Sequence, residues 1–285
     1  EVVLVSPRNP LNIGAAARAM ANFGFTRLGV VRPYGPTWRE ARSAVGAPEV
    51  LLNAKSAEHL AEAVAEATLV AGTGTLAYRR PEQSVVSLPE LGPLVARELR
   101  LGGRVALVFG PEKHGLTRED LAFCHLLVEI PTDARQPSMN LGQAVAVCLY
   151  ELAVHGDAAE AKELASGAKP RSLSNGSDGR AEAYTLHGKS AHDTEIDKPA
   201  ARSGDLELLA GVVEEAMVAA GYSPRGMLAA NRHDLRLMLR RLALSTRDTR
   251  RVLGLFRRIL WRLRRGTKSG AEGVCEILST MESKF

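Results

Sequence analysis

A chain of 285 residues is long enough for about two domains, each able to bury its own core. Its composition, 45% hydrophobic and 24% charged with 26 glycines and 14 prolines, excludes a collagen, a coiled coil and a fully disordered chain. The net charge is only +5, but residues 224–268 hold thirteen arginines and one lysine against two aspartates, so this segment carries +12 and the rest of the chain −7. The asymmetry favours nucleic acid over membrane as a polyanionic partner, although a solvated basic face would have the same composition.

Cysteine usage and hydropathy predict a cytoplasmic protein. Cys124, Cys148 and Cys275 are too few and too widely spaced for a disulfide framework, and no Cys-x-x-Cys pair occurs. No stretch approaches the roughly 18 apolar residues of a membrane span, and the N-terminus lacks the pattern of a signal peptide. Because the chain begins at Glu1 inside an apolar run, we expect a few native residues to precede it. We predict no metal site, since His114 has no second histidine or cysteine at ligand spacing.

Between residues 1 and 155, short aliphatic runs alternate with helical patterns. The expected strands are Val2–Val5, Arg27–Arg32, Thr68–Ala71, Arg104–Phe109 and Leu126–Ile130. The expected helices, whose apolar positions recur at three and four, are Ile13–Phe23, Ala57–Ala67, Pro89–Leu99 and Leu141–Val154. This alternation predicts parallel βαβ units, and therefore an α/β domain whose sheet is covered by helices on both faces.

Residues 156–204 interrupt this periodicity. Only five large apolar side chains occur among these forty-nine residues, too few to offset the entropy of ordering them, so we expect a flexible linker. Periodicity returns in residues 205–285, where we expect a small, basic, all-α C-terminal domain. Its expected helices are Asp205–Ala220, Asn231–Leu244, Thr246–Arg265 and Glu272–Met281. The candidate nucleic-acid-binding residues lie off the apolar stripe of the third helix and are Arg250, Arg251, Arg257, Arg258 and Arg262.

The first candidate motif, Asn12-Ile-Gly14-Ala-Ala-Ala-Arg18, follows the first strand. Gly14 and three alanines allow the helix to begin close to another backbone, and Asn12 is a candidate N-cap. An ordinary small-residue helix would need the same residues. The fingerprint Gly-x-Gly-x-x-Gly is absent from this turn and from the rest of the N-terminal half, which argues against a nucleotide-dependent oxidoreductase.

The second motif runs from Val108 to Thr117 and leaves the fourth of the expected strands. Gly110 permits the close approach of a ligand, Glu112 supplies an acceptor or a base, and Gly115 turns the chain before Thr117 caps the next helix. Open α/β sheets bind their ligands at such strand ends, although an ordinary turn would also fit this loop.

The third motif runs from Ile130 to Gly142. A strand ends, an irregular loop follows, and Ser138-Met139-Asn140 opens an apolar helix. Loops of this kind expose backbone amides and carbonyls that can bind the edge of an adenine. The small, apolar start of the helix suits close packing or a dimer contact.

In this order, and on these elements, the three motifs resemble those of the SPOUT superfamily of RNA methyltransferases. Its TrmH-like branch carries Asn-x-Gly-x-x-x-Arg, then Gly-x-Glu-x-x-Gly, then Ile-Pro followed by Ser-x-Asn-Leu. The resemblance covers residues 1–155. The sequence around the second motif and the Gly72-Thr-Gly74-Thr loop are most similar to the TrmJ group of tRNA ribose methyltransferases, which has a helical C-terminal extension. The resemblance implies a SPOUT-type parallel sheet with a C-terminal trefoil knot, a homodimer, and tRNA as a partner.

The resemblance also implies S-adenosylmethionine as the cofactor and a set of site residues. The cofactor would be bound largely through the backbone of Thr73, Gly74, Thr75, Gly110, Ile130, Pro137, Ser138 and Met139. The catalytic residues would be Arg18, Asn12, Glu112, Ser138 and Asn140. No metal is required, because the sulfonium of the donor already carries a positive charge.

Arg18 has two alternative roles. The family usually assigns this arginine as the base that takes the proton of the ribose 2′-hydroxyl. Because an arginine side chain has a pKa of about 12 or more, it stays protonated at neutral pH. The alternative is therefore that Arg18 clamps a phosphate while Glu112 or a water accepts the proton.

The expected function is methylation of a tRNA ribose in the anticodon loop, at cytidine or uridine 32. One alternative is another TrmH-like enzyme that acts on a D-loop guanosine or on ribosomal RNA. A more distant alternative is a non-catalytic RNA-binding protein, which would not need Asn12, Arg18 and Glu112 together.

Overall fold

The fold is taken from a computed structural model of the chain, which describes residues 1–35, 38–41, 43–74, 81–154, 200–223 and 225–282, with side chains as far as 265. Most of the expected linker, and Thr75 of the expected cofactor site, lie outside these ranges. No helix among the described residues is both long and apolar enough to cross a bilayer.

Seven parallel strands form a single sheet in the order β3-β2-β1-β6-β4-β7-β5. They are β1 (Val2–Val5), β2 (Leu28–Val31), β3 (Lys55–Ala57), β4 (Leu69–Thr73), β5 (Ser84–Ser87), β6 (Val105–Phe109) and β7 (Leu126–Glu129). The parallel α/β sheet and its five apolar strands are confirmed. The sequence did not predict β3 and β5, because an edge strand is held by one neighbour and needs no long apolar run.

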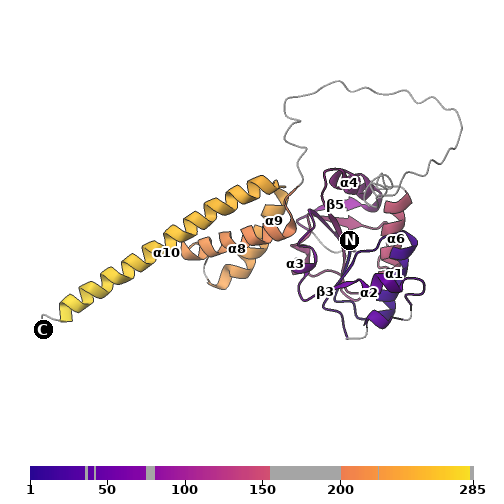
Figure 1. The fold of residues 1–285 in the computed structure, drawn as a ribbon, viewed down its shortest axis with the longest axis horizontal. Coiled ribbons are helices and arrows are strands. Elements are labelled where there is room, and N and C mark those ends of the chain that lie inside the picture. The colour runs from indigo at the N-terminus through magenta and orange to yellow at the C-terminus, as the bar shows by residue number, and fades with distance from the viewer. Residues whose placement is uncertain (36–37, 42, 75–80, 155–199, 224, 283–285) are drawn as a thin grey trace, which may run out of the picture.

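Helices cover both faces of the sheet (Figure 1). One core cluster contains Val2 and Leu4 of β1 and lies under α1 (Pro10–Asn22), α2 (Pro48–Leu52), α4 (Leu88–Arg100) and α6 (Leu141–Val154). The opposite cluster contains Val3 and Val5 and lies under α3 (Leu60–Ala63) and α5 (Arg118–Leu121). Successive residues of β1 therefore point to opposite faces and are all buried, as a central parallel strand requires.

Two predictions about the helices of this half were wrong in detail. The expected helix Ala57–Ala67 is only Leu60–Ala63, because Ala57 pairs with Val31 at the end of β3. Helix α1 begins at Pro10 rather than Ile13, since Asn9 is its N-cap and accepts a hydrogen bond from the Leu11 amide at 2.9 Å. Asn12 is therefore not the cap, which leaves its side chain free to make other contacts.

Cys124 and Cys148 are free thiols in the two opposite core clusters. Burial raises the pKa of each thiol to about 12, so both remain protonated and behave as small apolar side chains.

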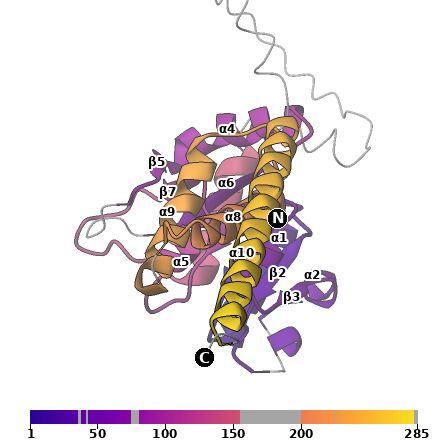
Figure 2. The ribbon, with the colours of Figure 1, turned by 90° about the vertical axis from the view of Figure 1, so that its left-hand side faces the viewer.

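The C-terminal part forms three helices, α8 (Ser203–Ala219), α9 (Leu228–Arg241) and α10 (Thr246–Glu282), which share a core that includes Leu209, Leu235 and Leu253. The prediction of two helices after residue 246 was wrong, because α10 is continuous for 37 residues. Gly266 and Gly270 lower helix propensity by about 1 kcal/mol each, but no proline ends the helix. Helix α10 packs along α8 and extends well beyond it (Figures 1 and 2).

These helices contact the N-terminal domain near α3 and α5. The amides of Ser203 and Gly204 donate hydrogen bonds to the carbonyls of Ala67 and Ala65, at 2.8 and 2.9 Å, so α8 begins two residues earlier than expected. The guanidinium of Arg236, on α9, lies 4.5 Å from the centre of the Phe123 ring.

Candidate active site

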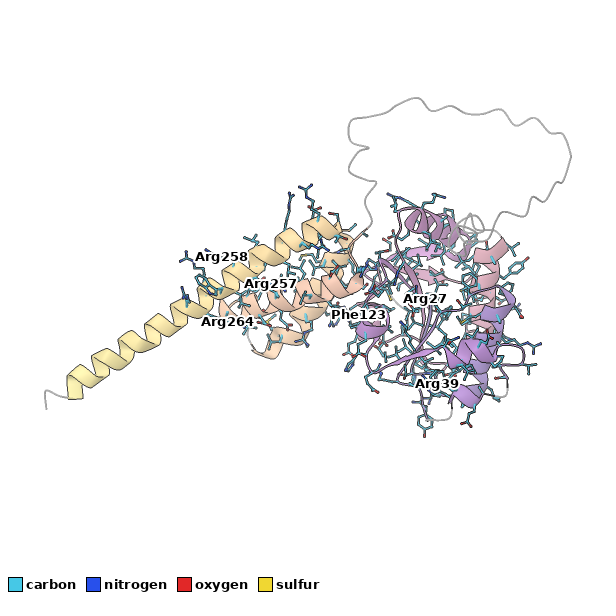
Figure 3. The ribbon with its side chains drawn as sticks, viewed as in Figure 1. Arg27, Arg39, Phe123, Arg257, Arg258 and Arg264 are labelled. Atoms are coloured by element: carbon cyan, nitrogen blue, oxygen red, sulfur yellow. The ribbon has the colours of Figure 1, made fainter. Side chains whose placement is uncertain are left out.

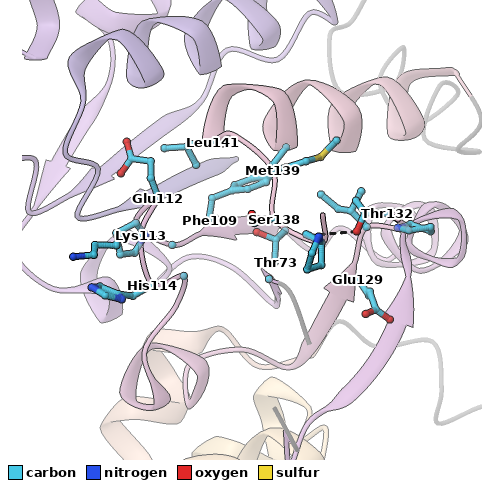
Figure 4. Close-up of a pocket in the computed structure, with 18 of the residues that line it drawn as sticks. Thr73, Phe109, Glu112, Lys113, His114, Glu129, Thr132, Ser138, Met139 and Leu141 are labelled. Carbon is cyan, nitrogen blue, oxygen red and sulfur yellow. Dashed lines mark hydrogen bonds between the residues drawn. The ribbon is translucent and has the colours of Figure 1, made fainter. Parts of the chain in front are cut away.

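A cavity of about 550 Å³ opens at the carboxyl ends of the adjacent strands β6, β4 and β7 (Figure 4). Three loops and the start of α6 form its walls, with Glu112, Lys113 and His114 on one side and Thr132 and Glu129 on the other. A cavity of this size, at this edge of a parallel sheet, is typical of binding sites for nucleotide-sized ligands.

The structure brings together all seven described residues of the expected cofactor site. They line this one cavity and are Thr73, Gly74, Gly110, Ile130, Pro137, Ser138 and Met139. Sequence reasoning missed other lining residues, among them Phe109 at the end of β6 and Thr132, whose hydroxyl donates to the Pro137 carbonyl at 3.3 Å across the loop (Figure 4).

The loop after β6 folds back on itself. A Cβ atom at Gly110 would collide with the backbone of Gly115 and Leu116, so only glycine fits at this position. The glycine is therefore required by the close approach of the loop's own backbone. Thr117 then caps α5 as expected: its hydroxyl donates to Asp120 at 2.7 Å and accepts from the Asp120 amide at 3.1 Å.

A chain of hydrogen bonds joins the three sequence motifs beside this cavity. The Asn12 amide group donates to Glu112 Oε1 at 2.8 Å, and the Asn140 amide group donates to Asn12 Oδ1 at 3.0 Å. Asn140 Oδ1 in turn accepts from the Gly142 amide at 2.9 Å, at the start of α6. Because an ionised carboxylate can only accept, Glu112 fixes the orientation of both asparagines.

Glu112 is an ionised acceptor in this arrangement. Partial burial raises the pKa of its carboxyl, but hydrogen bonds from Asn12 and from backbone amides, including those of Arg8 and Asn9, outweigh burial and lower the pKa below its usual 4.5. A carboxylate with a lowered pKa is a weaker base. The arrangement suits Glu112 to positioning rather than to proton transfer.

Arg18 lies apart from this cluster. It is exposed on α1, six residues after Asn12, or about 9 Å further along the helix axis, and it does not line the cavity. Within the described residues its side chain makes no ion pair or hydrogen bond. A single chain therefore assembles Asn12, Glu112 and Asn140 but not Arg18.

The small residues of the first motif do allow close backbone approach, as predicted. A Cβ at Gly142 of α6 would lie 2.7 Å from Ala15 Cβ of α1, so the two helices pack closely at this point. Close packing of α1 on α6 places Asn12 and Asn140 within hydrogen-bonding distance.

The five candidate nucleic-acid-binding arginines are all exposed on α10, and none pairs with a carboxylate among the described side chains. Other arginines of the basic segment do pair with glutamates of α8: Arg264 lies 2.6 Å from Glu215, and Arg232 lies 2.9 Å from Glu214. Arg257, Arg258 and Arg264 are marked along α10 in Figure 3.

One group of side chains has the spacing of metal ligands, namely Glu82, His233 and Asp234, whose ligand atoms lie within 4.8 Å of one another. Glu82 is exposed and lies 3.7 Å from the guanidinium of Arg118, a cation that competes with a metal ion. We assign this group no role.

A wholly parallel α/β sheet with a cavity at the carboxyl ends of adjacent strands is the arrangement typical of proteins that bind nucleotide-like ligands at that edge. The sequence model of the SpoU rRNA Methylase family matches residues 1–150, which is more than half of the chain. The chain therefore belongs to the SpoU rRNA Methylase family.

Two relatives are similar over this same half. The tRNA (cytidine/uridine/adenosine-2′-O-)-methyltransferase TrmJ of Pseudomonas aeruginosa is 39% identical over 162 residues, covering 56% of this chain and 63% of the relative. The tRNA (cytidine-2′-O-)-methyltransferase TrmJ of Methanocaldococcus jannaschii is 40% identical over 153 residues, covering 53% of this chain and 66% of the relative. The matched part thus spans slightly less than two thirds of either relative.

A solved structure is similar over nearly the whole chain. The crystal structure of TrmJ from Z. mobilis ZM4 aligns with a TM-score of 0.70 and 25% identity, covering 90% of this chain and 97% of that chain. The structural similarity therefore extends beyond the family match and includes C-terminal helices.

Proposed function

We propose that this protein is an S-adenosylmethionine-dependent methyltransferase that modifies the 2′-hydroxyl of a tRNA ribose. The carrying observation is the cavity at the ends of β4, β6 and β7, with the hydrogen-bonded chain of Glu112, Asn12 and Asn140 beside it. Family membership supports methyl transfer, and relatives named as tRNA 2′-O-methyltransferases support the substrate.

The residues of the cavity fit the cofactor. Its volume of about 550 Å³ lies within the usual range for a small-molecule site. Gly74, Gly110 and Pro137 present backbone at the walls, while Ile130 and Met139 offer apolar surface for an adenine ring. When bound, the cofactor supplies a methyl group on a sulfonium, which is already an activated leaving group.

The ribose must be oriented and its hydroxyl deprotonated. We assign orientation to Asn12, Asn140 and Ser138, because the first two have fixed amide directions and Ser138 lines the cavity. Arg18 would act as a cation that holds the adjacent phosphate and lowers the pKa of the hydroxyl. A water molecule is a better proton acceptor than Glu112, whose pKa is already lowered.

A homodimer would bring Arg18 of one subunit to the cavity of the other. The exposed position of Arg18, outside its own cavity, supports this arrangement. So do the exposed apolar side chains of α1 and α6, where Leu11, Tyr150 and Val154 are 56%, 46% and 54% exposed. A second copy that covers these helices would bury this surface.

Two further features of the proposal concern the chain path and the C-terminal helices. In the SPOUT fold, the segment after β7 passes through a loop as a trefoil knot, and the position of β7 between β4 and β5 is compatible with this path. We assign the helices from Ser203 onward to a separate RNA-binding domain, supported by its own core and its exposed arginines, with the segment from residue 156 to this helix as a linker.

Mass mapping of ribose methylation tests this function. Purified protein, S-adenosylmethionine and tRNA from a strain that lacks the enzyme should yield a 2′-O-methyl group at cytidine or uridine 32 in the anticodon loop. Methylation of a D-loop guanosine or of ribosomal RNA would mean that the protein is a 2′-O-methyltransferase with a target outside the anticodon loop. No methylation of any RNA would overturn the proposed activity.

A further inference from the structure

The outer face of α10 carries an exposed tryptophan. The chain contains only two tryptophans: Trp38 is 2% exposed and lies in the sheet core, whereas Trp261 is 42% exposed. A large aromatic ring that remains half in water contributes little to folding, which makes Trp261 a candidate for binding.

Three cations surround the Trp261 ring. The guanidinium carbons of Arg265, Arg258 and Arg262 lie 4.3, 5.2 and 5.8 Å from the ring centre. Arg258 and Arg265 lie three residues before and four residues after Trp261, which places all three on one side of the helix. No carboxylate among the described side chains pairs with these arginines, so like charges gather here without a neutralising partner.

Trp261 does not belong to an apolar stripe. The other exposed apolar residues of this part of α10 are Leu255 and Ile259, at 58% and 37% exposure. A rotation of about 100° per residue places them roughly 120° and 160° around the helix from Trp261, with Arg258 and Arg262 in between. A partner helix or a lipid surface would require a continuous apolar face, and a second copy would place arginines against arginines.

A single-stranded polyanion fits this surface best. Its phosphates would neutralise the arginines, and its unpaired bases offer flat rings that stack on an aromatic side chain. The bases of a duplex already stack on each other, and side chains cannot reach them through the narrow major groove of A-form RNA.

We propose that Trp261 stacks on an unpaired base of RNA, while Arg258 and Arg265 bind the phosphates on either side of it. This inference rests on the proposed function for its RNA substrate. In this proposal α10 recognises unpaired bases in single-stranded loops and does not only supply positive charge.

Tryptophan fluorescence and affinity test this inference on the full-length protein. An oligouridylate of about 12 nucleotides, within the usual site size, should quench the emission of Trp261, while a duplex of the same length should not. Trp261→Ala should weaken binding of the oligouridylate about tenfold, and Trp261→Phe should retain most of the affinity. Leu255→Ala, which removes another exposed apolar side chain from the same helix, is the control and should leave binding unchanged.

The salt dependence separates stacking from charge. Trp261→Ala should lower affinity at every salt concentration without changing the slope of log affinity against log salt, whereas Arg258→Ala should flatten that slope. The inference is wrong if Trp261→Ala weakens binding no more than Leu255→Ala does, or if the duplex quenches as strongly. It is also wrong if phosphatidylserine vesicles displace the RNA and shift Trp261 emission to the blue.

Failure of this inference differs from failure of the proposed function. A protein that methylates tRNA while Trp261→Ala binds RNA normally would refute only the stacking. A protein that binds oligouridylate through Trp261 but transfers no methyl group to any RNA would refute only the activity.

Discussion

At the edge of the sheet, Asn12, Glu112 and Asn140 are joined by hydrogen bonds between residues that lie 100 and 128 positions apart in the sequence. On α10, by contrast, Arg258, Trp261 and Arg265 lie together because they are only three and four positions apart. The first arrangement exists only when the tertiary fold places three loops together. The second requires only a helix. Substitutions at the cavity should therefore act together and depend on fold and subunit contacts, while those on α10 should act independently and depend on salt.

The largest effect that separates the two regions is expected at Arg18. Arg18→Ala should reduce methyl transfer to tRNA at least about 100-fold, because it removes a positioned cation at the developing charge. Arg18→Lys should also fail if planar, bidentate contact with phosphate is needed. Single-turnover assays measure the loss, and calorimetry should show nearly normal binding of S-adenosylmethionine. Near-normal turnover of Arg18→Ala would show that Arg18 takes no part in the reaction.

Subunit mixing locates Arg18 in the proposed dimer. If Arg18 acts in the partner's cavity, mixing Arg18→Ala subunits with Asn140→Ala subunits creates heterodimers in which one of the two sites is intact, so activity should reappear. If Arg18 acts in its own cavity, every site in the mixture is defective and activity stays low.

Removal of the helical part should separate the two regions physically. A chain that ends near Ser174 should stay folded, dimeric and able to bind S-adenosylmethionine, yet lose most of its affinity for tRNA, because the exposed arginines of α10 are gone. The interactions that join this part to the N-terminal domain include hydrogen bonds to Ala65 and Ala67 and the contact of Arg236 with Phe123. The two core clusters of the sheet contain no residue of α8 to α10, so we expect the sheet to keep its core without these helices. Size-exclusion chromatography and calorimetry check the prediction. An insoluble or monomeric fragment would show that α8 to α10 complete the core or the dimer interface.

A smaller effect, dependent on pH, is expected at Glu112. Glu112→Gln should lower the melting temperature at neutral pH by about 2–4 °C, since a glutamine amide cannot accept all the hydrogen bonds made to the carboxylate. The pKa of Glu112 is lowered in the folded protein, so its stabilisation is present above its usual 4.5 and is lost as pH falls through the folded value.

The difference in melting temperature between the wild type and Glu112→Gln should therefore shrink as the solution is acidified from neutral pH. Melting curves across this range provide the measurement. A difference that stays constant with pH would mean that the ionisation of Glu112 contributes nothing to stability.

These regions also differ in how far sequence could predict them. The central strands follow from apolar runs, whereas the cavity residues follow from the resemblance of the three motifs to the SPOUT superfamily. The hydrogen bonds of Asn12 follow from neither, because the Asn9-Pro10 pair caps α1 and the partners of Asn12 lie about a hundred residues away. That pair is a recognisable helix start and could have corrected the prediction. The proposed place of Arg18 in the cavity of a second subunit would depend on contacts between subunits, which no pattern within one chain can supply.

On α10 the sequence predicted which arginines leave the apolar stripe, but not which are already neutralised. Arg264 was outside the candidate set, and its pairing with Glu215 of α8 depends on helix packing between positions 49 residues apart. Trp261 was overlooked because a lone aromatic within a helical pattern is usually part of a core.

The smallest expected effect compares two arginines of α10 that carry the same charge in different surroundings. Arg258 is exposed and pairs with no carboxylate among the described side chains, whereas Arg264 is held 2.6 Å from Glu215. Arg258→Gln should flatten the slope of log tRNA affinity against log salt by about 0.7–0.9, the value of one phosphate contact. Arg264→Gln removes the same charge and should leave the slope nearly unchanged, because this guanidinium is already neutralised. Filter binding across a salt series measures both. Equal slopes for the two variants would mean that net charge alone, and not the exposed face of α10, sets the affinity for tRNA.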